Sequence, residues 1–388
     1  MDAEFLAAAT GVINHLEKEL RRATPAERAS WRALELGCGS GRLLRPMSRH
    51  FLEIHGVDLS SPPMNEVREN LLDVSNVRLH QSQGMGLEQF ADESIGFLYS
   101  YDFFQHLSSR ETVLNFLRES RRVLRPGGLA RLEFAGAPDG QFSSREILEL
   151  AFAHDFQVLA LEDVSTPSMW TTWRRQPSGW SRAVAQRFES ADGRHPSVIR
   201  RITNASSFEP VAPSRGRFAS ICIRAEGLPA DAGLHHLRVT VGNSLGTITY
   251  IGPPDRGGSQ SIYADLPELE ATGLLPVQMF WLDRPISEAA TLRVIPPGPA
   301  IPRLVFAPKR TQGREVRISL EEVARPYELE MTLSGRPIED LEKVCTDFRA
   351  QRYEVRFRIP EEIGPGMHHL DITIGRRRLA PWPLEVAV

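Results

Sequence analysis

The chain has 388 residues, of which 41% are hydrophobic, and its formal net charge at pH 7 is −3. The length predicts two or three domains, and the hydrophobic fraction is sufficient for packed cores. The near-neutral charge argues against a nucleic-acid partner, and no apolar run reaches the length of a membrane span. The N-terminus does not resemble a signal peptide. We therefore expect no nucleic-acid or membrane partner and a location in a bacterial-type cytoplasm.

Segments with helical periodicity alternate with short apolar segments over the first 175 residues. Helices are expected at 5–20, 42–51, 62–73, 109–124 and 144–155. Strands are expected at 33–36, 53–60, 76–83, 94–102, 129–136, 156–165 and 169–175, with a turn at "RPGG" (125–128). This alternation predicts a doubly wound α/β domain over residues 1–178, with helices on both faces of its sheet.

The pattern changes after a predicted linker at 179–194. Short alternating segments separated by turn residues predict strands, at spacings typical of β-sandwiches. Two all-β sandwiches are expected, at 195–297 and 302–388, joined by the Pro-rich stretch 296–304. The predicted fold class is therefore multidomain, with one α/β domain followed by two sandwiches.

An internal repeat supports two related modules. "GLHHLRVTVG" from Gly233 matches "GMHHLDITIG" from Gly366 at an offset of 133, with "FASICIR" and "YEVRFRI" in corresponding places upstream. The repeated histidine pairs, 235–236 and 368–369, could suggest metal ligands. Adjacent strand residues point to opposite faces, so we favour packing at a turn-to-strand junction.

The three cysteines, Cys38, Cys222 and Cys345, are scattered and show no CxxC spacing. An odd number at such positions supports neither a disulfide framework nor a zinc site. We expect no metal in this protein.

The stretch "LELGCGSGR" places glycines at every second position: Gly37, Gly39 and Gly41. Each glycine costs conformational entropy, so their alternation suggests that something approaches the backbone closely. The spacing is GxGxG and not the GxGxxG that places a pyrophosphate on a helix N-terminus. A dinucleotide site is therefore disfavoured.

The acidic residue followed by GxGxG resembles motif I of the class I S-adenosylmethionine-dependent methyltransferases, and the resemblance spans about 30 to 175. "GVDLS" places Asp58 where the family has a ribose-binding acid, and Gln83 occupies the slot of an adenine-side acid. "FLYSYDFFQHL", "LRESRRVLRPGGLARLEF" and "MWTTWRR" resemble later motifs in the same order. The cofactor implied is S-adenosyl-L-methionine, with S-adenosyl-L-homocysteine as product.

The resemblance implies a set of cofactor contacts from the glycine loop and from the ends of the next strands. They are Glu35, Leu36, Gly37, Cys38, Gly39, Gly41, Asp58, Leu59, Gln83, Gly84, Met85, Ser100 and Tyr101. Simpler roles remain for some of them. Glu35 could cap the following helix, Asp58 could form a turn, and Cys38 is expected only to be tolerated in a tight loop.

Alignment of an acceptor with the activated methyl group can supply most of the rate, and a base is needed only if the acceptor must lose a proton. The candidate bases are His106 and Asp102, although His106 could instead pack or cap a helix. Two departures from the family leave a weakened, methyltransferase-like binding protein as an alternative. Gln83 replaces an acid, and Ile95 and Gly96 replace an aromatic residue and an acid. A nicotinamide-dependent oxidoreductase is a third hypothesis.

The module at 195–297 resembles immunoglobulin-like domains of the IPT/TIG type, and 302–388 is a looser match. Sandwiches of this kind carry no chemistry by themselves. We expect them to position an acceptor, which would be a small molecule or a glycan, or to mediate protein or self-association.

Overall fold

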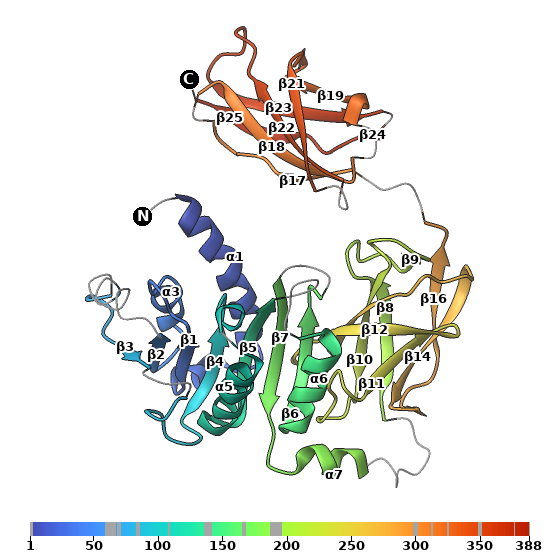
Figure 1. Ribbon diagram of the computed structural model, residues 1–388. Coiled ribbons are helices and arrows are strands. Elements are labelled where there is room, and N and C mark those ends of the chain that lie inside the picture. Colours follow the sequence, from blue (N-terminus) through green and yellow to red (C-terminus); the bar gives the residue numbers. More distant parts are fainter. Residues whose placement is uncertain are drawn as a thin grey trace. The chain divides into compact units, whose positions relative to one another are not determined.

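The computed structural model describes residues 3–58, 67, 71–82, 86–107, 109–135, 142–164, 168–186, 196–297, 302–311, 313–323, 326–347, 351–375 and 377–387. The chain divides into two compact units, Met1–Pro297 and Gly298–Val388. The first unit combines an α/β sheet with a β-rich region at 196–297, called here the first β-module. The second unit is a β-rich region over 302–387, called the second β-module (Figure 1).

The α/β part has the strand order β3-β2-β1-β4-β5-β7-β6. The strands are β1 (Arg32–Leu36), β2 (Glu53–Asp58), β3 (Val77–Gln81), β4 (Ile95–Ser100), β5 (Leu124–Ala135), β6 (Phe156–Glu162) and β7 (Ser168–Arg175). Pairs from β3 to β5 are parallel, whereas β7 is antiparallel to both β5 and β6. The predicted doubly wound sheet is therefore confirmed, with one reversed strand near its edge.

The helices are α1 (Ala3–Leu20), α2 (Pro25–Ala29), α3 (Leu44–Ser48), α5 (Arg110–Val123), α6 (Ser144–Ala153) and α7 (Trp180–Gln186). The helix expected at 42–51 is only the five residues of α3, and most of the one expected at 62–73 lies outside the described residues. α7 lies inside the segment predicted as a linker. The turn expected at 125–128 lies inside β5, where the pairing with β4 passes from Ile95↔Leu124 to Phe97↔Leu129 and Gly127 has a positive φ of 77°.

Two separate cores form on the two faces of this sheet. Val113 and Phe116 of α5 pack with Leu34 and Leu98, whose side chains point to one face. Leu16 of α1 packs on the opposite face, in a cluster that includes Ala33 and Tyr99. Successive strand residues alternate between the faces, so each strand contributes to both cores.

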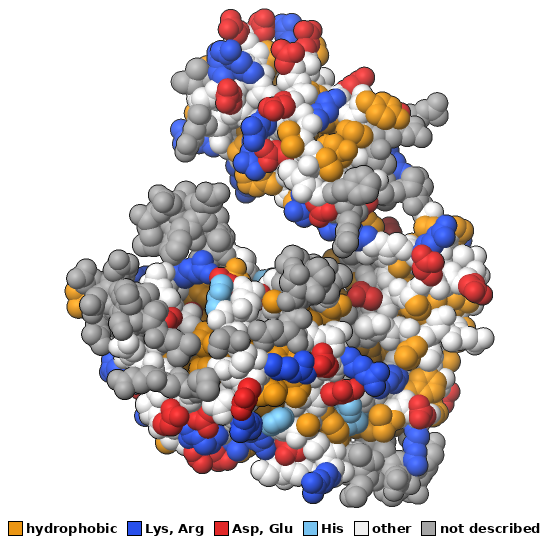
Figure 2. All heavy atoms as spheres, in the orientation of Figure 1, with side chains coloured by type: hydrophobic (Ala, Val, Ile, Leu, Met, Phe, Trp, Pro, Cys, Tyr) orange, Lys and Arg blue, Asp and Glu red, His pale blue; other side chains and the backbone are white. Residues whose placement is uncertain are grey.

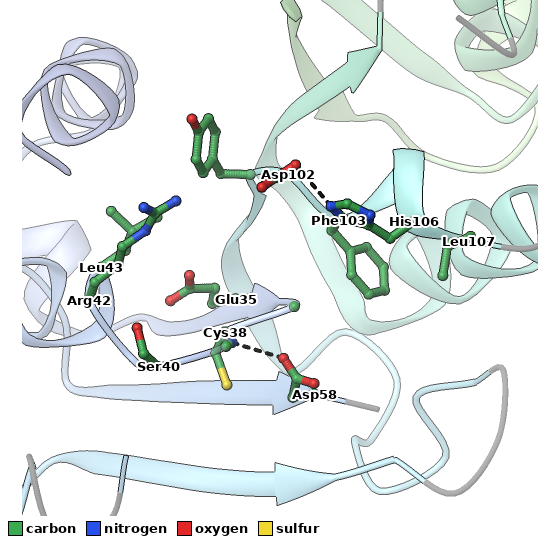
Figure 3. Close-up of a pocket in the computed structure, with 13 residues that line it drawn as sticks. Glu35, Cys38, Ser40, Arg42, Leu43, Asp58, Asp102, Phe103, His106 and Leu107 are labelled. Atoms are coloured by element: carbon green, nitrogen blue, oxygen red, sulfur yellow. Dashed lines mark hydrogen bonds and ion pairs between the residues drawn. The ribbon is translucent and has the colours of Figure 1, made fainter. Parts of the chain in front are cut away.

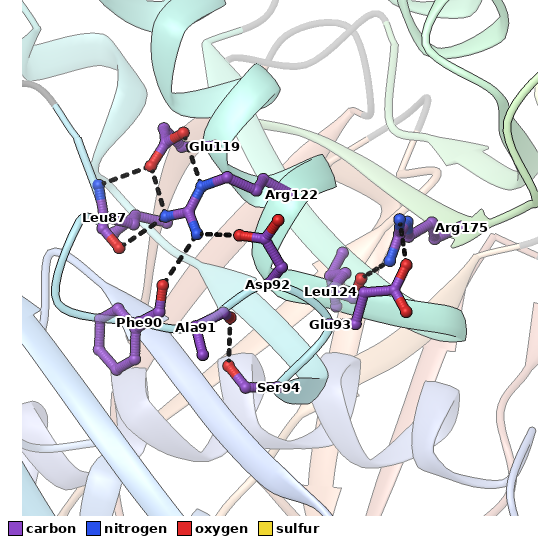
Figure 4. A network of polar contacts seen from close by, with 10 residues as sticks. All are labelled: Leu87, Phe90, Ala91, Asp92, Glu93, Ser94, Glu119, Arg122, Leu124 and Arg175. Atoms are coloured by element: carbon purple, nitrogen blue, oxygen red, sulfur yellow. Dashed lines mark hydrogen bonds and ion pairs between the residues drawn. The ribbon is translucent and has the colours of Figure 1, made fainter.

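A polar network holds the segment that leads into β4 (Figure 4). Arg122 of α5 donates to the carbonyl oxygens of Leu87 and Phe90, each at 2.9 Å, and to the carboxylates of Glu119 and Asp92. The bond from Arg122 holds the pKa of Glu119 below its ordinary value. This partly buried cluster lies at the N-terminal end of β4, so it fixes the strand from the end opposite Tyr101.

The first β-module contains β8 (Val198–Asn204), β9 (Val211–Pro213), β10 (Ser220–Glu226), β11 (Leu237–Val241), β12 (Ser244–Ile251), β13 (Gln260–Asp265), β14 (Gly273–Trp281), β15 (Arg284–Pro285) and β16 (Ala290–Ile295). Strands β8-β10-β13-β12 are paired in one ladder, and β11, β14, β16 and β9 follow from β12 in another. Strand β12 also pairs with β6 through Tyr250 and Ala160, so the α/β sheet continues into the module.

The junction between sheet and module is a shared core and not a flexible tether. Gln157 of β6 donates to the carbonyl oxygens of Ala230 and Ala232 at 2.9 and 2.8 Å, and the N–H of Leu234 donates to Val158 at 2.8 Å. The core residues on the α5 face of the sheet and those of the first β-module belong to one continuous cluster.

The histidine pair at 235–236 lies in this junction. His235 stacks on Phe152 with ring centroids 4.0 Å apart, and His236 stacks on Trp281 at 5.0 Å. His236 is 2% exposed, and burial together with nearby His235 lowers its pKa to about 3. The predicted packing at a turn-to-strand junction is confirmed for this pair. Among the described residues, no group of His, Cys, Asp and Glu side chains is arranged to hold a metal ion.

The second β-module contains β17 (Arg303–Phe306), β18 (Glu315–Glu321), η3 (Pro326–Glu328), β19 (Leu329–Leu333), β20 (Arg336–Pro337), β21 (Leu341–Asp347), β22 (Arg352–Arg358), β23 (Gly366–Ile374), β24 (Arg377–Arg378) and β25 (Trp382–Val386). One sheet has the order β17-β18-β22-β21, and the other contains β19, β20 and β23 to β25. The two sheets share a core that is separate from those of the first unit.

The two β-modules share most of their strand pairing. The corresponding pairs are Val241↔Val277 with Leu333↔Leu370, Val277↔Ala290 with Leu370↔Trp382, and Ile223↔Ile262 with Ile318↔Val355. This equates β10 with β18, β11 with β19, β12 with β21, β13 with β22, β14 with β23 and β16 with β25. The repeat predicted at an offset of 133 is therefore wrong in register, because it matches β11 to β23 and β10 to β22. All these strands alternate apolar and polar residues, so non-equivalent strands resemble one another in sequence.

No described helix is long and apolar enough to cross a membrane. On the face shown in Figure 2, basic and acidic side chains are interspersed over the first unit. This agrees with the small net charge of the sequence.

Candidate functional site

The loop after β1 holds its three alternating glycines at positive φ, with values of 73° at Gly37, 47° at Gly39 and 76° at Gly41. Glycine adopts this region without steric cost. A Cβ on Gly37 would lie 2.5 Å from the Phe103 ring, and one on Gly41 would lie 2.7 Å from Val67. Among the described residues, a Cβ on Gly39 would meet no atom within 4 Å. Two glycines thus make room for the protein's own side chains, and Gly39 borders open space.

Glu35 lies next to the end of β1 as a buried carboxyl group. Its Oε2 accepts a hydrogen bond of 2.9 Å from the hydroxyl of Tyr99, which lies on the neighbouring β4. Burial raises the pKa of Glu35 to about 8, against the opposing effects of Tyr99 and Arg42. The N-cap of α3 is Leu43, which makes no side-chain cap bond. Glu35 is therefore a partner of Tyr99 and not the cap of the next helix.

Asp58 ends β2 next to the glycine loop. Its Oδ2 accepts a hydrogen bond of 2.8 Å from the N–H of Gly39 (Figure 3). The strand register pairs Val57 with Leu36, which brings the ends of β1 and β2 together. The Asp58 carboxylate therefore fixes the loop around Gly39, a longer-range role than that of a local turn former.

Asp102 follows β4 in the left-handed conformation, with φ of 55°. Aspartate is among the residues that tolerate this region. Its N–H donates to the carboxylate of Glu133 at 2.9 Å, and the hydroxyl of Ser168 donates to the same carboxylate at 2.8 Å. Burial raises the pKa of Glu133. The buried Glu133 thus positions the backbone from which the Asp102 side chain projects.

His106 closes the short helix η1 (Phe104–His106), and its Nε2 lies 3.1 Å from Oδ1 of Asp102 (Figure 3). The His106 side chain is 69% exposed, so it does not pack beneath the loop. The N-cap of α5 is Ser109, whose hydroxyl accepts from the N–H of Thr112. The structure therefore leaves His106 paired with Asp102 at the surface of a cavity, neither buried nor capping α5.

Arg42 and Tyr101 face each other near the same cavity. The Arg42 guanidinium carbon lies 5.1 Å from the centroid of the Tyr101 ring, a distance at which a cation is attracted to an aromatic face. Tyr101 stacks on Trp170 of β7 with centroids 5.9 Å apart and planes 10° apart. This stacking fixes the ring at the end of β4.

These residues surround a cavity of about 550 Å³ beyond the carboxyl ends of β1, β2 and β4. Its volume lies within the range of small-molecule sites, and its position is where ligands bind in open α/β sheets. The lining includes three carboxyl groups, Glu35, Asp58 and Asp102, and one guanidinium, Arg42. Glu35 is mostly protonated at pH 7 because its pKa is raised, and a positively charged ligand would favour its ionised form.

Most of the predicted site residues meet at this cavity. Those that line it are Glu35, Gly37, Cys38, Gly39, Asp58, Tyr101, Asp102 and His106. Leu36, Gly41 and Ser100 are buried near it without lining it. Leu59, Gln83, Gly84 and Met85 lie outside the described residues.

Sequence reasoning missed Ser40 and Arg42, which also line the cavity, and Tyr99, which holds Glu35. Ser40 and Arg42 could have been predicted from their position beside the glycines. Tyr99 could have been predicted from the alternation of strand residues, which places it on the same face as Tyr101.

The departure at Gly96 has a packing explanation. A Cβ on Gly96 would lie 2.5 Å from the ring of Trp31. Gly96 is near the start of β4, whereas the cavity lies beyond Ser100, roughly 13 Å further along the strand. The missing acid therefore makes room for Trp31 and leaves the cavity lining unchanged.

The family comparison agrees with this architecture. Residues 34–132 match a family model described as "Methyltransferase domain". The match covers the glycine loop, Asp58 and the Asp102–His106 pair. No curated protein matches the chain.

The solved structures that are similar to part of this chain include two described as S-adenosylmethionine-dependent methyltransferases and one described as the PH0226 protein. The enzyme from Aquifex aeolicus is 18% identical, with 42% of this chain and 97% of that chain covered and a TM-score of 0.33. The PH0226 protein from Pyrococcus horikoshii is 22% identical, with 43% and 91% covered and a TM-score of 0.36. The enzyme from Mesorhizobium loti is 17% identical, with 40% and 96% covered and a TM-score of 0.35.

Proposed function

We propose that this protein is an S-adenosylmethionine-dependent methyltransferase (EC 2.1.1.-). The observation that carries the proposal is Asp58, whose carboxylate holds the open Gly39 loop at the rim of an acid-lined cavity. The match of residues 34–132 to a methyltransferase domain supports the same reaction class. The antiparallel β7 between β5 and β6 departs from the strand order of dinucleotide-binding folds, which disfavours the nicotinamide-dependent alternative.

The residues present fit the proposed cofactor. Gly39 leaves its backbone open to a ligand, Asp58 offers an acceptor for hydroxyl groups, and Glu35 can ionise beside a cationic group. When bound, S-adenosyl-L-methionine would supply an activated methyl group on a positively charged sulfur. The acidic lining would favour it over uncharged nucleosides, because opposite charges attract more strongly where water is partly excluded.

The protein's own contribution would be alignment, with an optional proton transfer. Tyr101, held by Trp170, and Arg42 form one wall against which an acceptor can be placed. His106, paired with Asp102, is exposed at that side and would accept a proton from a hydroxyl acceptor. We infer a small molecule or a glycan as acceptor, with the β-modules, which we take as immunoglobulin-like, positioning it or mediating association.

Calorimetric titration tests the cofactor assignment. S-adenosyl-L-methionine and S-adenosyl-L-homocysteine should bind, and NAD should not. Asp58→Ala should weaken binding by about 1–3 kcal/mol, because a charged acceptor is lost. Asp58→Asn keeps an acceptor for the Gly39 N–H and should lose less. Unchanged affinity in both variants would remove Asp58 from the site.

Turnover of an identified acceptor tests His106. If His106 is a base, His106→Gln should lower kcat about 100-fold or more while the affinity for the cofactor stays unchanged. Because the ring is exposed, the substitution should not change the unfolding temperature. If this variant has wild-type turnover, His106 is not a base, and alignment of the acceptor with the methyl group accounts for the catalysis. A protein that binds the cofactor but transfers no methyl group to any acceptor would instead support the weakened, binding-only alternative.

A further inference from the structure

Two adjoining cavities form a groove on one sheet face of the first β-module. The first, of about 470 Å³, lies between α1, the end of β6 and strands β12 and β13, and the second, of about 430 Å³, lies on β8, β10 and β13. Ser261 and Tyr263 line both, so the two volumes are contiguous. The ladder register explains the shared face. Thr203, Cys222 and Tyr263 lie opposite one another, as do Arg201, Arg224 and Ser261.

The groove carries more positive than negative charge, although the whole chain is slightly acidic. Its cations are Lys18, Arg21, Arg200, Arg201 and Arg224, and its carboxylates are Glu162 and Glu226. Both carboxylates are neutralised, Glu162 by Lys18 and Arg131, and Glu226 by Arg200. Arg21 and Arg201 are exposed, and neither forms an ion pair with a residue that the structure describes. One uncompensated guanidinium therefore stands at each end of the groove.

The middle of the groove combines aromatic and hydroxyl groups. Tyr263 packs edge-to-face against Tyr250 at 5.8 Å, and Lys18 lies 3.9 Å above the Tyr250 ring. The hydroxyl of Ser261 accepts a bond of 3.0 Å from Arg224. Thr203, Thr249 and Ser259 add further hydroxyls to the lining. Rings, hydroxyls and guanidinium groups in one groove suit sugar rings that bear acidic groups.

The groove is connected to the candidate site along the α1 face of the sheet. Strand β6 runs parallel to β4, so Glu162 lies at the same sheet edge as Tyr101, three strand spacings or about 14 Å away. A continuous series of side-chain contacts bridges this distance: Tyr101–Trp170, Trp170–His15, His15–Arg131, Arg131–Glu162, Glu162–Lys18 and Lys18–Tyr250. Because the junction is a shared core, this spacing is fixed.

We propose that the groove binds an acidic glycan, a chain of sugar rings carrying carboxylate groups, and holds it for methyl transfer at the cavity around Asp58 and His106. The part about methyl transfer rests on the function proposed above, whereas the binding of the glycan does not. Arg21 and Arg201 are the specificity-determining residues, and they select acidic over neutral sugars.

Binding is tested on the full chain without cofactor, with hexagalacturonate as the acidic probe and maltohexaose as its neutral counterpart. Calorimetry should detect hexagalacturonate and little or no maltohexaose. Arg21→Gln and Arg201→Gln should each weaken binding about three- to fivefold, and the double variant tenfold or more, since each exposed ion pair contributes modestly. Arg284→Gln is the matched control, because Arg284 is exposed on β15 of the same module, outside the groove. This variant should bind like the wild type.

Several outcomes would overturn the proposal. The first is that hexagalacturonate does not bind, or that maltohexaose binds equally well. The second is that hexaglutamate or a six-residue oligothymidylate binds as tightly as hexagalacturonate. The third is that Arg284→Gln weakens hexagalacturonate binding as much as Arg21→Gln and Arg201→Gln do. Asp58→Ala separates the two proposals, because it should weaken cofactor binding about 5- to 150-fold and leave the affinity for hexagalacturonate unchanged. Glycan binding in a protein that fails to bind the cofactor would retain the groove and reject the methyltransferase.

Discussion

The two β-modules share most of their strand pairing but differ in what the equivalent strands β12 and β21 contact. In the first module, β12 pairs with β11, with β13 and, through Tyr250, with β6 of the α/β sheet. In the second, the equivalent β21 pairs with β22 alone among the described strands. The first module consequently shares a core with the α/β sheet, whereas the second has its own. Strand topology therefore does not decide whether a module is an independent folding unit. What decides it is whether the module's core is separate from that of its neighbour.

Truncation should show the largest difference between the two β-modules. A chain ending at Pro297 should fold and keep the unfolding temperature of the first unit, because the core of 302–387 is separate. A chain ending at Gln186 should not unfold cooperatively, because β6 then has an open edge and the ring contacts of Phe152 with His235 are lost. Circular dichroism melting of both truncations checks this. A cooperative transition in the shorter chain would show that the α/β part folds alone.

Equivalent core substitutions should separate the two units. Trp281→Ala in the first unit should cost about 3–5 kcal/mol, and Ile374→Ala at the equivalent position of the second about 2–5 kcal/mol. Scanning calorimetry of the full chain should show two transitions, with each substitution lowering only its own. A Trp281→Ala variant in which both transitions move together would contradict the division at Pro297.

The stability of the first unit should depend on pH because the pKa of Glu35 is raised by folding. Its pKa is about 8 in the folded chain and 4.5 in the unfolded chain, so the folded state binds the extra proton between these values. The stability of the first unit should therefore fall as pH rises from 4.5 to 8. Glu35→Gln keeps an acceptor for Tyr99 and should remove this loss, with the largest gain in unfolding temperature at pH 8. The unfolding transition of the second unit serves as the internal reference, and its temperature should not change on Glu35→Gln substitution.

His236 should make the junction sensitive to acid. Its pKa is about 3 when folded and 6.5 when unfolded, so stability is complete above 6.5 and decreases as pH falls toward 3. Neither ring nitrogen has a hydrogen-bond partner among the described residues, so His236→Phe retains the stack on Trp281 without losing a bond. The variant should melt at a higher temperature than the wild type at pH 5 and at a similar one at pH 7.5. His369→Phe, at an exposed position of the second module, is the control.

The sequence predicts the α/β half well because its signals are local. The glycine loop, the acid after the second strand and the amphipathic helix at 109–124 each define a position without reference to distant residues. The cavity follows from these, since parallel strands bring their ends to one edge. Gly96 illustrates the limit. Its identity depends on Trp31, which lies 65 positions away, and a departure from a family motif cannot by itself distinguish a lost function from a packing change.

The β-modules are less predictable because pairing between strands is set by long-range contacts. Alternation identifies each strand, but strands that share the alternation are interchangeable in sequence, and so β11 resembles β23 more than its true equivalent, β19. The junction was missed for the same reason. Tyr250 and Ala160 meet across 90 positions, and neither residue type indicates a strand that joins two sheets.

The pairing of β12 with β6 also sets an order of events during synthesis. The residues of the α/β sheet up to Arg175 leave the ribosome about one hundred residues before Trp281, which completes the junction core. At roughly 5–20 residues per second this interval lasts about 5–20 s. During this interval the β6 edge lacks its pairing with β12, and the rings of Phe152 and Trp180 lack their contacts with His235 and His236. The nascent chain should therefore bind chaperones in this interval and release them once β14 has emerged.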